Sequence, residues 1–368
     1  MAPRPTTTPM PADALTALPS AAPGATAAAA ADTLWASALL PGLIGCALLL
    51  ALGAAALALW LHRHARLQPL PTPAVRRWQA GPESTADAAT RGLPAPIPRV
   101  IWTYWHDAQP PLVVQRCIDG WRRLNPQHTV HLLHAGNVRQ FLPDLPQALA
   151  QLNIAKQTDW MRLALLQRHG GIWLDASIIL TRPLDDWLPA LQQAQRADFV
   201  GFYLDGYTTA QHFPVIESWF LAAAAGNPFI AQWLARFHAA VVEQGTANYL
   251  QALRQQGCFA QYTQNIGEPS YHTIHVVAQE VLHQGVAQPP AQPWRLALLR
   301  AEDSAYWLHL QARWKRRPLY ARLLWARGDA SCWPALVKLR GGERSKLEPW
   351  LRRRRWRAGS LAGRFLAD

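Results

Sequence analysis

The feature that most constrains this chain is a long apolar segment near its N-terminus, from Leu34 to Leu61, which contains no charged residue. About 20 apolar residues in a helix are enough to cross the hydrocarbon core of a bilayer. A cleaved signal peptide would have a shorter apolar region, of roughly 7–15 residues, directly after a basic start. Here the segment is longer and lies deeper in the chain. We therefore predict that residues 34–61 form a single transmembrane helix.

Basic residues flank the apolar segment mainly on one side. Arg63, Arg66, Arg76 and Arg77 follow it, whereas Arg4 is the only basic residue that precedes it. Cytoplasmic flanks of membrane helices carry the excess of Lys and Arg. The part of the chain that follows the helix is therefore predicted to lie in the cytoplasm, anchored to the inner membrane by one pass.

Composition divides the rest of the chain into four parts. Residues 1–33 are dominated by Ala, Pro and Thr, which predicts a disordered tail. Residues 62–96 are rich in proline, which is typical of a linker. Residues 97–340 alternate strand-like and helix-like segments, and this alternation predicts an α/β domain. Residues 341–368 form a basic C-terminal tail.

Several elements of the α/β domain can be assigned from runs of β-branched and aromatic residues, from helical periodicity and from turn residues. We predict strands at 99–105, 128–134, 172–180 and 198–203. We predict helices at 112–124, 147–169 with a break near Asn153, 216–225, 228–242, 273–283 and 304–313.

The charge balance favours an anionic partner. The chain has 36 Lys and Arg against 23 Asp and Glu, a net charge of +13, which suits nucleic acid, a membrane surface or a phosphorylated substrate. Basic residues concentrate in 340–357, where Trp350 and Trp356 lie between them. Arginine is attracted to anionic lipid and tryptophan favours the membrane interface. We therefore expect this tail to contact membrane lipids, with a solvated charge run as the alternative. No nucleic-acid-binding motif accompanies the charge, so nucleic acid is not the expected partner.

The sequence lacks the motifs that are typical of several enzyme classes. The sequence has no GxSxG elbow, no P-loop and no Rossmann glycine fingerprint. The four cysteines are too dispersed for a disulfide scaffold or a thiolate zinc site. His272 and His275 have the spacing of a helical zinc pair but lack a recognisable third ligand, which favours a surface or core role.

The most informative positions are two aspartates, Asp159 and Asp175, and the arginine that accompanies the first. Asp159 and Arg162 share one face at the start of a helix, a spacing that by itself is more often a structural ion pair. Asp175 follows the strand-like run GGIWL, and ligands of α/β sheets usually bind beyond such strand ends. A Mg²⁺ or Mn²⁺ ion typically takes one or two protein carboxylates and shares its other positions with phosphates and water. Asp175 is therefore a candidate ligand for a cation that neutralises a departing diphosphate.

Two further residues have open alternatives. Trp105 ends the first strand, where its flat face could stack on a nucleobase or simply belong to the core. Glu217 could position an acceptor hydroxyl, or it could be a favourable negative charge at a helix N-terminus.

In order and spacing, these motifs resemble the capsular polysaccharide synthesis proteins, relatives of the glycosyltransferase family 32 enzymes whose sugar-binding region contains a DxD motif. The resemblance covers roughly residues 97–340. It is carried by Ile97–Trp105, Cys117–Trp121 with Asn125-Pro126, Asp159 with Arg162, the GGIWLDAS run at 170–177, Pro214–Phe220 and Gly226–Phe229.

The resemblance implies a GT-A-like fold, in which a Rossmann-like sheet binds a nucleotide sugar. By position, Trp105 would stack on the base, Asp159 would bind ribose or donor-sugar hydroxyls, and Arg162 would bind the donor sugar.

The resemblance also implies a metal and a basic residue. Asp175 would be the first aspartate of the DxD motif, and Ser177 stands where many relatives have the second, so Asp175 and Ser177 would hold Mn²⁺ or Mg²⁺. Lys338 lies where the capsular branch often carries a basic residue, which could reach the donor diphosphate.

Together these features predict a membrane-anchored, hexosyltransferase-like enzyme. It would move a sugar from a nucleotide-sugar donor to a glycan or lipid-linked acceptor in surface or capsular polysaccharide synthesis, with retention of configuration. Asp175 and Glu217 are the expected catalytic residues. Ser177 brings no charge and so leaves an alternative, a catalytically weak scaffold of the same fold that binds nucleotide sugars or polysaccharide.

Overall fold

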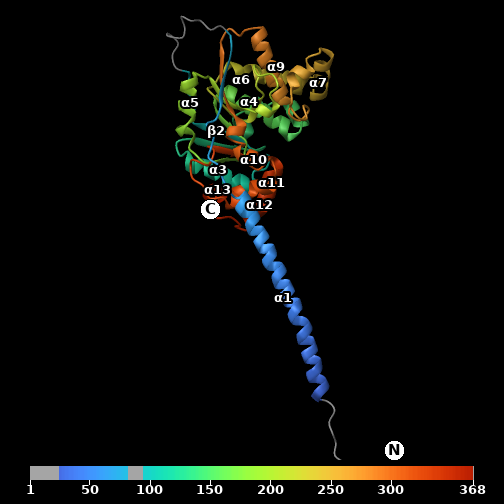
Figure 1. Cartoon of the computed structure of the whole chain (residues 1–368). Helices are drawn as coiled ribbons and strands as arrows, with labels where there is room; N and C mark the ends of the chain where they lie inside the picture. The colour runs from blue at the N-terminus through green and yellow to red at the C-terminus, as the bar shows by residue number, and fades with distance from the viewer. Residues whose placement is uncertain (1–24, 82–93, 368) are drawn as a thin grey trace, which may run out of the picture. The chain divides into compact units, whose positions relative to one another are not determined.

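The computed structural model describes residues 25–81 and 94–367 (Figure 1). The chain divides into two compact units, residues 1–60 and residues 61–368. Most of the first unit is helix α1 (Ala25–His64), whose portion Pro41–His64 has a mean hydropathy of 2.4 and is long and apolar enough to cross a membrane. The helix begins earlier than the apolar segment because alanine is the strongest helix former. The remainder of the predicted tail lies outside the described residues.

The second unit is built on a mixed seven-stranded sheet of order β1-β8-β6-β7-β4-β2-β3. Strands β2, β3, β4, β6 and β8 run in one direction, and β1 and β7 run antiparallel to their neighbours. The carboxyl ends of β2, β4, β6 and β8 therefore meet at one edge of the sheet. Its strands are β1 (Val75–Ala80), β2 (Val100–Tyr104), β3 (Thr129–Leu133), β4 (Gly171–Leu174), β6 (Phe199–Tyr203), β7 (Ile216–Ala223) and β8 (Trp294–Arg300).

Helices cover both faces of this sheet, which confirms the predicted α/β class. Figure 1 shows α4, α6, α7 and α9 grouped apart from α3 and α10–α13. The first group is α4 (Ile154–His169), α6 (Pro228–Phe237), α7 (Thr246–Gln255) and α9 (Thr273–Ala287), joined by α8 (Phe259–Thr263). The second comprises α3 (Leu112–Leu124), α5 (Leu188–Gln195), α10 (Trp307–Gln311), α11 (Arg316–Trp325), α12 (Gly341–Arg352) and α13 (Leu361–Phe365), with a small antiparallel sheet of β5 (Ile178–Leu180) and β9 (Leu336–Lys338).

Short helical turns join several of these elements. They are the 3₁₀ turns η1 (Val138–Gln140), η2 (Gln147–Gln151), η3 (Leu184–Asp186), η4 (Asp205–Tyr207) and η6 (Ala301–Asp303), and the π-helical turn η5 (His238–Glu243).

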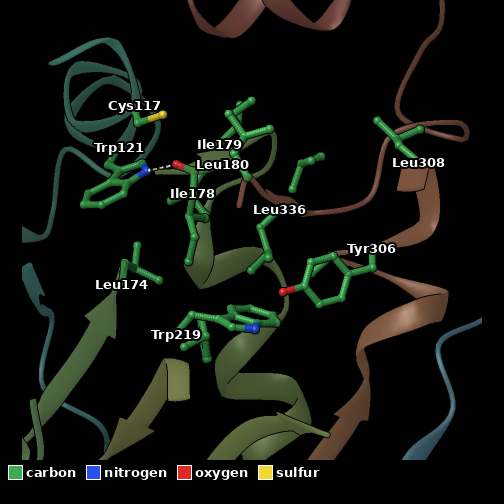
Figure 2. Packing of buried hydrophobic residues seen from close by; sticks show 14 of the residues in the cluster. Cys117, Trp121, Leu174, Ile178, Ile179, Leu180, Trp219, Tyr306, Leu308 and Leu336 are labelled. Carbon is green, nitrogen blue, oxygen red and sulfur yellow. Dashed lines mark hydrogen bonds between the residues drawn. The ribbon is translucent and has the colours of Figure 1, made fainter. Parts of the chain in front are cut away.

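Alternate residues of the central strands enter two separate apolar cores. In β4, Trp173 packs into the core under α4, α6 and α9, whereas Leu174 packs into the core under α3. The second core contains Trp121 of α3, whose indole nitrogen donates to the carbonyl of Ile178 at 2.8 Å (Figure 2). This bond ties α3 to the small β5–β9 sheet and so fixes the segment that follows β4.

The turn before β4 requires glycine. Gly170 and Gly171 both have positive φ, +65° and +102°, and a Cβ at Gly170 would lie 2.4 Å from the backbone nitrogen of Ala225. An L-residue is strained in this backbone region and has no space for its side chain there. The pair thereby ends α4 and starts β4, as the sequence predicts.

The strand predicted over 172–180 is interrupted in the structure. The backbone nitrogen of Asp175 donates to the carbonyl of Trp219, and that of Ile178 donates back to the carbonyl of Asp175. The resulting turn at Asp175–Ser177 separates β4 from β5 and moves the chain from the large sheet to the small one. The predicted ligand residues thus lie in a turn between two strands.

The helix predicted over 216–225 is wrong, because this segment is strand β7. All of its residues are buried between β4 and β6 in the middle of the sheet. A short apolar run that is buried on both faces has no strand periodicity, so its sequence pattern does not distinguish it from a buried helix.

Two segments outside the predicted domain belong to the fold. Residues 75–80, within the predicted linker 62–96, form edge strand β1 and pair with β8. The predicted tail 341–368 forms α12 and α13, which place Leu347, Leu351 and Leu361 in the core beside α3. The leucines at 347 and 351 are one helical turn apart, a spacing that the surrounding arginines obscure.

Candidate active site

A cavity of about 950 Å³ opens at the sheet edge where β2, β4, β6 and β8 end. Its wall includes residues directly after β2 and β4, the first turns of α4 and α9, the start of β7, and the segment from β9 into α12. Every site residue predicted from the sequence lines it: Trp105, Asp159, Arg162, Asp175, Ser177, Glu217 and Lys338.

Asp175 lies at the centre of a polar cluster in the cavity. Its Oδ2 accepts a hydrogen bond from Lys338 Nζ at 2.6 Å, and its Oδ1 accepts one from Trp173 Nε1 at 3.1 Å. Arg162 Nη2 lies 3.4 Å from the same Oδ1. Burial raises the pKa of Asp175, but Lys338 and Arg162 lower it by more, so the net pKa lies below the usual value. The carboxylate is therefore charged at neutral pH.

Arg162 links Asp175 to Asp159. Its Nη2 lies 3.3 Å from Asp159 Oδ1, and its Nη1 donates to the carbonyl and the hydroxyl of Ser218 on β7. Burial raises the pKa of Asp159 to about 6 despite the nearby Arg162 and Lys156. The predicted Asp159/Arg162 pair is thus a structural ion pair, and both of its members also face the cavity.

Ser177 is bonded to the backbone of β9's neighbour Leu339. Its Oγ donates to the carbonyl of Leu339 at 3.0 Å, and the residue is 3% exposed. The backbone nitrogen of Leu339 donates in turn to the carbonyl of Ser177. Ser177 therefore joins the turn after β4 to the end of β9.

The donor set around Asp175 does not fit a divalent cation. The Lys338 ammonium lies 2.6 Å from one oxygen of the carboxylate and the Arg162 guanidinium lies 3.4 Å from the other, so a divalent cation bound there would meet two positive charges. The Ser177 hydroxyl proton is directed at a carbonyl. The ligand pair predicted from the sequence is thus present in the cavity but not arranged around an ion.

Glu217 is a second buried carboxyl group of the cavity. It lies in β7 and is 8% exposed, so a role as a charge at a helix N-terminus does not apply. Burial raises the pKa of Glu217 to about 7; Asp175 and Glu302 raise it further, and Lys338 opposes them. A carboxyl group with such a pKa can hold or release a proton near neutral pH.

Trp105 is half-buried and packs against the core beside α3. The Arg344 guanidinium lies 4.6 Å from the centre of its ring. The core role considered for Trp105 is the one that its packing supports, and because the ring also lines the cavity, stacking on a nucleobase stays a prediction.

Sequence reasoning missed the contribution of the C-terminal segment. Arg340 and Arg344 line the cavity, and the Arg340 guanidinium lies 5.4 Å from the centre of the Trp314 ring. Both arginines belong to the charge run at 340–357, and Arg344 lies within the predicted tail 341–368. The available signal was their position directly after Lys338.

His275, considered above as half of a zinc pair, has a structural role. Its ring Nδ1 lies 2.7 Å from the carbonyl of Ile216, and burial lowers its pKa to about 3. The neutral ring donates this hydrogen bond and joins α9 to β7. Of the surface and core roles expected for His275, its contacts support the core role.

Comparison with known proteins agrees with the motif analysis. Residues 85–249 match the family described as "Capsular polysaccharide synthesis protein". This match confirms the family resemblance. The matched segment contains every predicted site residue except Lys338.

Proteins with related sequences are named as glycosyltransferases. The chain is 32% identical over 155 residues to the O-glycosyltransferase braB of Annulohypoxylon truncatum, covering 37% of this chain and 36% of that protein. It is 29% identical over 119 residues to the O-glycosyltransferase PaGT of Phomopsis amygdali, covering 28% and 29%. It is 24% identical over 161 residues to the putative glycosyltransferase HOC1 of Saccharomyces cerevisiae, covering 38% and 39%. The matched region spans about a third of each of these relatives.

Solved structures with a distant likeness include two glycosyltransferases. The PaToxG glycosyltransferase has a TM-score of 0.30 at 16% identity, covering 54% of this chain and 81% of that one. The UDP-bound glycosyltransferase domain from the YGT toxin has a TM-score of 0.29 at 10% identity, covering 51% and 69%.

The pKa of Glu217 predicts a pH dependence of stability. Because its pKa is higher in the folded protein, at about 7, than the usual 4.5, the folded state loses stability as pH rises from about 4.5 to about 7. Glu217→Gln removes this loss. The free energy of unfolding of the variant, relative to that of wild type, should therefore rise by on the order of 2–3 kcal/mol from pH 4.5 to pH 8.

Urea unfolding of the full chain in detergent, at both pH values, measures this difference. Glu243→Gln, at a side chain that is 66% exposed, is the matched control and should show no change of this size. A stability difference for Glu217→Gln that is the same at both pH values would contradict the assignment.

Proposed function

We propose that this chain is a glycosyltransferase that transfers a sugar from a nucleotide-sugar donor to a hydroxyl group of a glycan or lipid-linked acceptor. The observation that carries the proposal is the cavity at the carboxyl ends of β2, β4, β6 and β8, which brings together an aromatic ring, a charged carboxylate and several cations. Ligands of α/β proteins bind at this edge of the sheet. The family match and the names of the related proteins support the same activity.

The cavity contains groups suited to each part of such a donor. Trp105 with Arg344 over its ring combines an aromatic face with a cation, which suits a nucleobase next to a phosphate. Asp159 and Arg162 would bind hydroxyl groups of the ribose and of the donor sugar. Their mutual contact and the bonds of Arg162 to Ser218 hold both side chains in place before a donor arrives.

The chemical step needs stabilisation of negative charge on the departing diphosphate and a position for the acceptor hydroxyl. Lys338 and Arg162 supply positive charge beside Asp175. Glu217, with its pKa near 7, would accept a hydrogen bond from the acceptor hydroxyl. Retention of configuration and a place in surface or capsular polysaccharide synthesis are part of this proposal and follow from the family resemblance. The Mn²⁺ or Mg²⁺ ion expected from the sequence is not part of this proposal, because the donor set around Asp175 does not fit a divalent cation.

A donor screen tests the activity. The full chain in detergent, incubated with a panel of nucleotide sugars, should release nucleotide from at least one of them. Asp175→Asn removes the charge that orients Lys338 and Arg162, so turnover should fall about 10²–10³-fold, the size expected when one preorganised electrostatic contact of an active site is lost.

Asp119→Asn is the matched control, because Asp119 pairs with Arg122 on the exposed face of α3. Its turnover should equal that of wild type. Full turnover in Asp175→Asn would contradict the proposal. Donor binding without turnover by the wild type would favour the alternative, a binding scaffold of the same fold.

We further propose that the enzyme is anchored to the cytoplasmic membrane by α1 and contacts its anionic lipids. Only Ala65 and Arg66 separate the end of α1 from Leu67, which packs against the core of the second unit. The next residues are fixed to the end of α10 and to the loop after α11, because the Gln68 nitrogen donates to the Gln311 side chain and the Leu70 nitrogen donates to the Ser331 carbonyl. Exposed basic side chains lie between α10 and the first turn of α11, and from the last residue of α12 onward: Arg313, Lys315, Arg316, Arg317, Arg352, Arg353 and Arg355.

Protease accessibility in a bacterial host tests this orientation. If the basic flank after α1 faces the cytoplasm, the second unit should be protected in intact spheroplasts and digested in inverted membrane vesicles. A periplasmic protein that is digested in spheroplasts provides the control. Digestion of the second unit in intact spheroplasts would reverse the proposed orientation.

A further inference from the structure

We propose that the ammonium group of Lys338 takes the place of a divalent metal in this site, and that Ser177 is the positioning residue that holds Lys338 there. The inference rests on the proposed function and names how the diphosphate of the donor is bound. A departing diphosphate needs a positive partner, and either a bound metal or a set of basic side chains can supply it. The residues around Asp175 provide basic side chains for this purpose.

Lys338 lies where it can bind a phosphate. Its side chain lines the cavity and is 12% exposed, with Nζ 2.6 Å from Asp175 Oδ2. An ammonium group has three donors, of which Asp175 accepts one. The remaining donors can reach oxygen atoms of a diphosphate, while Asp175 keeps the ammonium group oriented.

The backbone that carries Lys338 is fixed on both sides. In the small sheet, Lys338 is the register partner of Ile178, and its backbone nitrogen donates to the carbonyl of Ala305. The next residue, Leu339, exchanges two bonds with Ser177: its nitrogen donates to the Ser177 carbonyl, and its carbonyl accepts from the Ser177 hydroxyl. These contacts hold β9 against the turn that presents Asp175.

The chemistry of these contacts explains a serine at position 177. The carbonyl of Leu339 needs a donor, and a hydroxyl group supplies one, whereas an ionised carboxylate only accepts hydrogen bonds. An aspartate at this 3% exposed position would place a negative charge against a carbonyl oxygen. The residue that would complete a metal-binding DxD pair is therefore incompatible with the bond that holds Lys338.

Further cations extend the positive wall from Lys338 along the cavity. Arg340 and Arg344 follow Lys338 in sequence and line the cavity, with their guanidinium groups over the rings of Trp314 and Trp105. Three basic side chains thus face one cavity from a single segment. Carboxyl groups partly offset these charges: Glu343 accepts from Arg340 Nε at 2.7 Å, and the buried Glu217 lines the same cavity. Asp159 pairs with Arg162, and Glu302 accepts from the backbone of Gly206.

Calorimetric titration of the full chain in detergent with UDP and with GDP tests the inference, because it measures binding without turnover. At least one of the two should bind equally well in EDTA and in Mn²⁺. Lys338→Ala should weaken this binding by about 10- to 100-fold, the effect of losing a charge-assisted hydrogen bond, and Lys338→Arg should retain part of it. Lys346→Ala, at an exposed position of α12, is the matched control and should bind as wild type does.

The variant Ser177→Asp distinguishes diphosphate binding by Lys338 from diphosphate binding by a metal. If Lys338 replaces the metal, the variant should bind the nucleoside diphosphate more weakly than wild type, with or without Mn²⁺. If a metal is used, the variant should bind more tightly when Mn²⁺ is added, and this result would overturn the inference. The wild-type comparison of EDTA with Mn²⁺ decides the question even if a variant fails to fold.

The outcomes also distinguish this inference from the proposed function. Wild-type binding or turnover that EDTA abolishes and Mn²⁺ restores would overturn the role of Lys338 and leave the glycosyltransferase function intact. Failure of the wild type to bind any nucleoside diphosphate would overturn both.

Discussion

The contact between Asp175 and Lys338 is the interaction on which the site depends. The two residues are 163 positions apart in sequence, and their side chains meet at 2.6 Å. One side chain follows the large sheet at the end of β4, and the other ends the small sheet at β9. Two opposite charges that face a partly exposed cavity stabilise each other and remain available to a polar ligand. Their position fixes where positive charge is available in the cavity.

Most of the fold can be understood as support for this contact. The turn at Asp175–Ser177 moves the chain out of the large sheet, and the bond from Trp121 to Ile178 anchors the start of the small one (Figure 2). Trp219, which lies beside Tyr306 in the same core, accepts through its backbone carbonyl the bond from Asp175 that ends β4. The aromatic core therefore determines the backbone geometry of the charged residues above it.

Sequence patterns predicted the local part of this arrangement well. Helix α3 has the predicted bounds, and the Gly170-Gly171 turn and the strand before Trp105 lie where their residue types indicated. Each of these features depends on neighbours in the chain. β7 was missed because a strand buried on both faces has no alternation, and its place in the middle of the sheet depends on partners distant in sequence.

Sequence patterns predict which residues gather in the cavity, whereas the roles given to these residues stay predictions. All seven predicted residues line one cavity, because motifs at strand ends meet at one sheet edge. The arrangement of Asp175 and Ser177 did not follow from the motif, since the hydroxyl bonds to Leu339 only after β9 has paired with β5. Arg344 falls in the segment predicted as a separate tail, because the charge of this segment hides the leucines that pack α12 into the core, and Arg340 is the last residue of the predicted domain.

The most direct test of the central claim is a crystal structure of the protein with a bound nucleoside diphosphate, grown with Mn²⁺ and measured at the manganese absorption edge. The account predicts a phosphate oxygen at hydrogen-bonding distance from Lys338 Nζ, about 2.7–2.9 Å, with no anomalous peak beside Asp175. An anomalous peak that bridges Asp175 and the diphosphate, with Lys338 displaced, would contradict it.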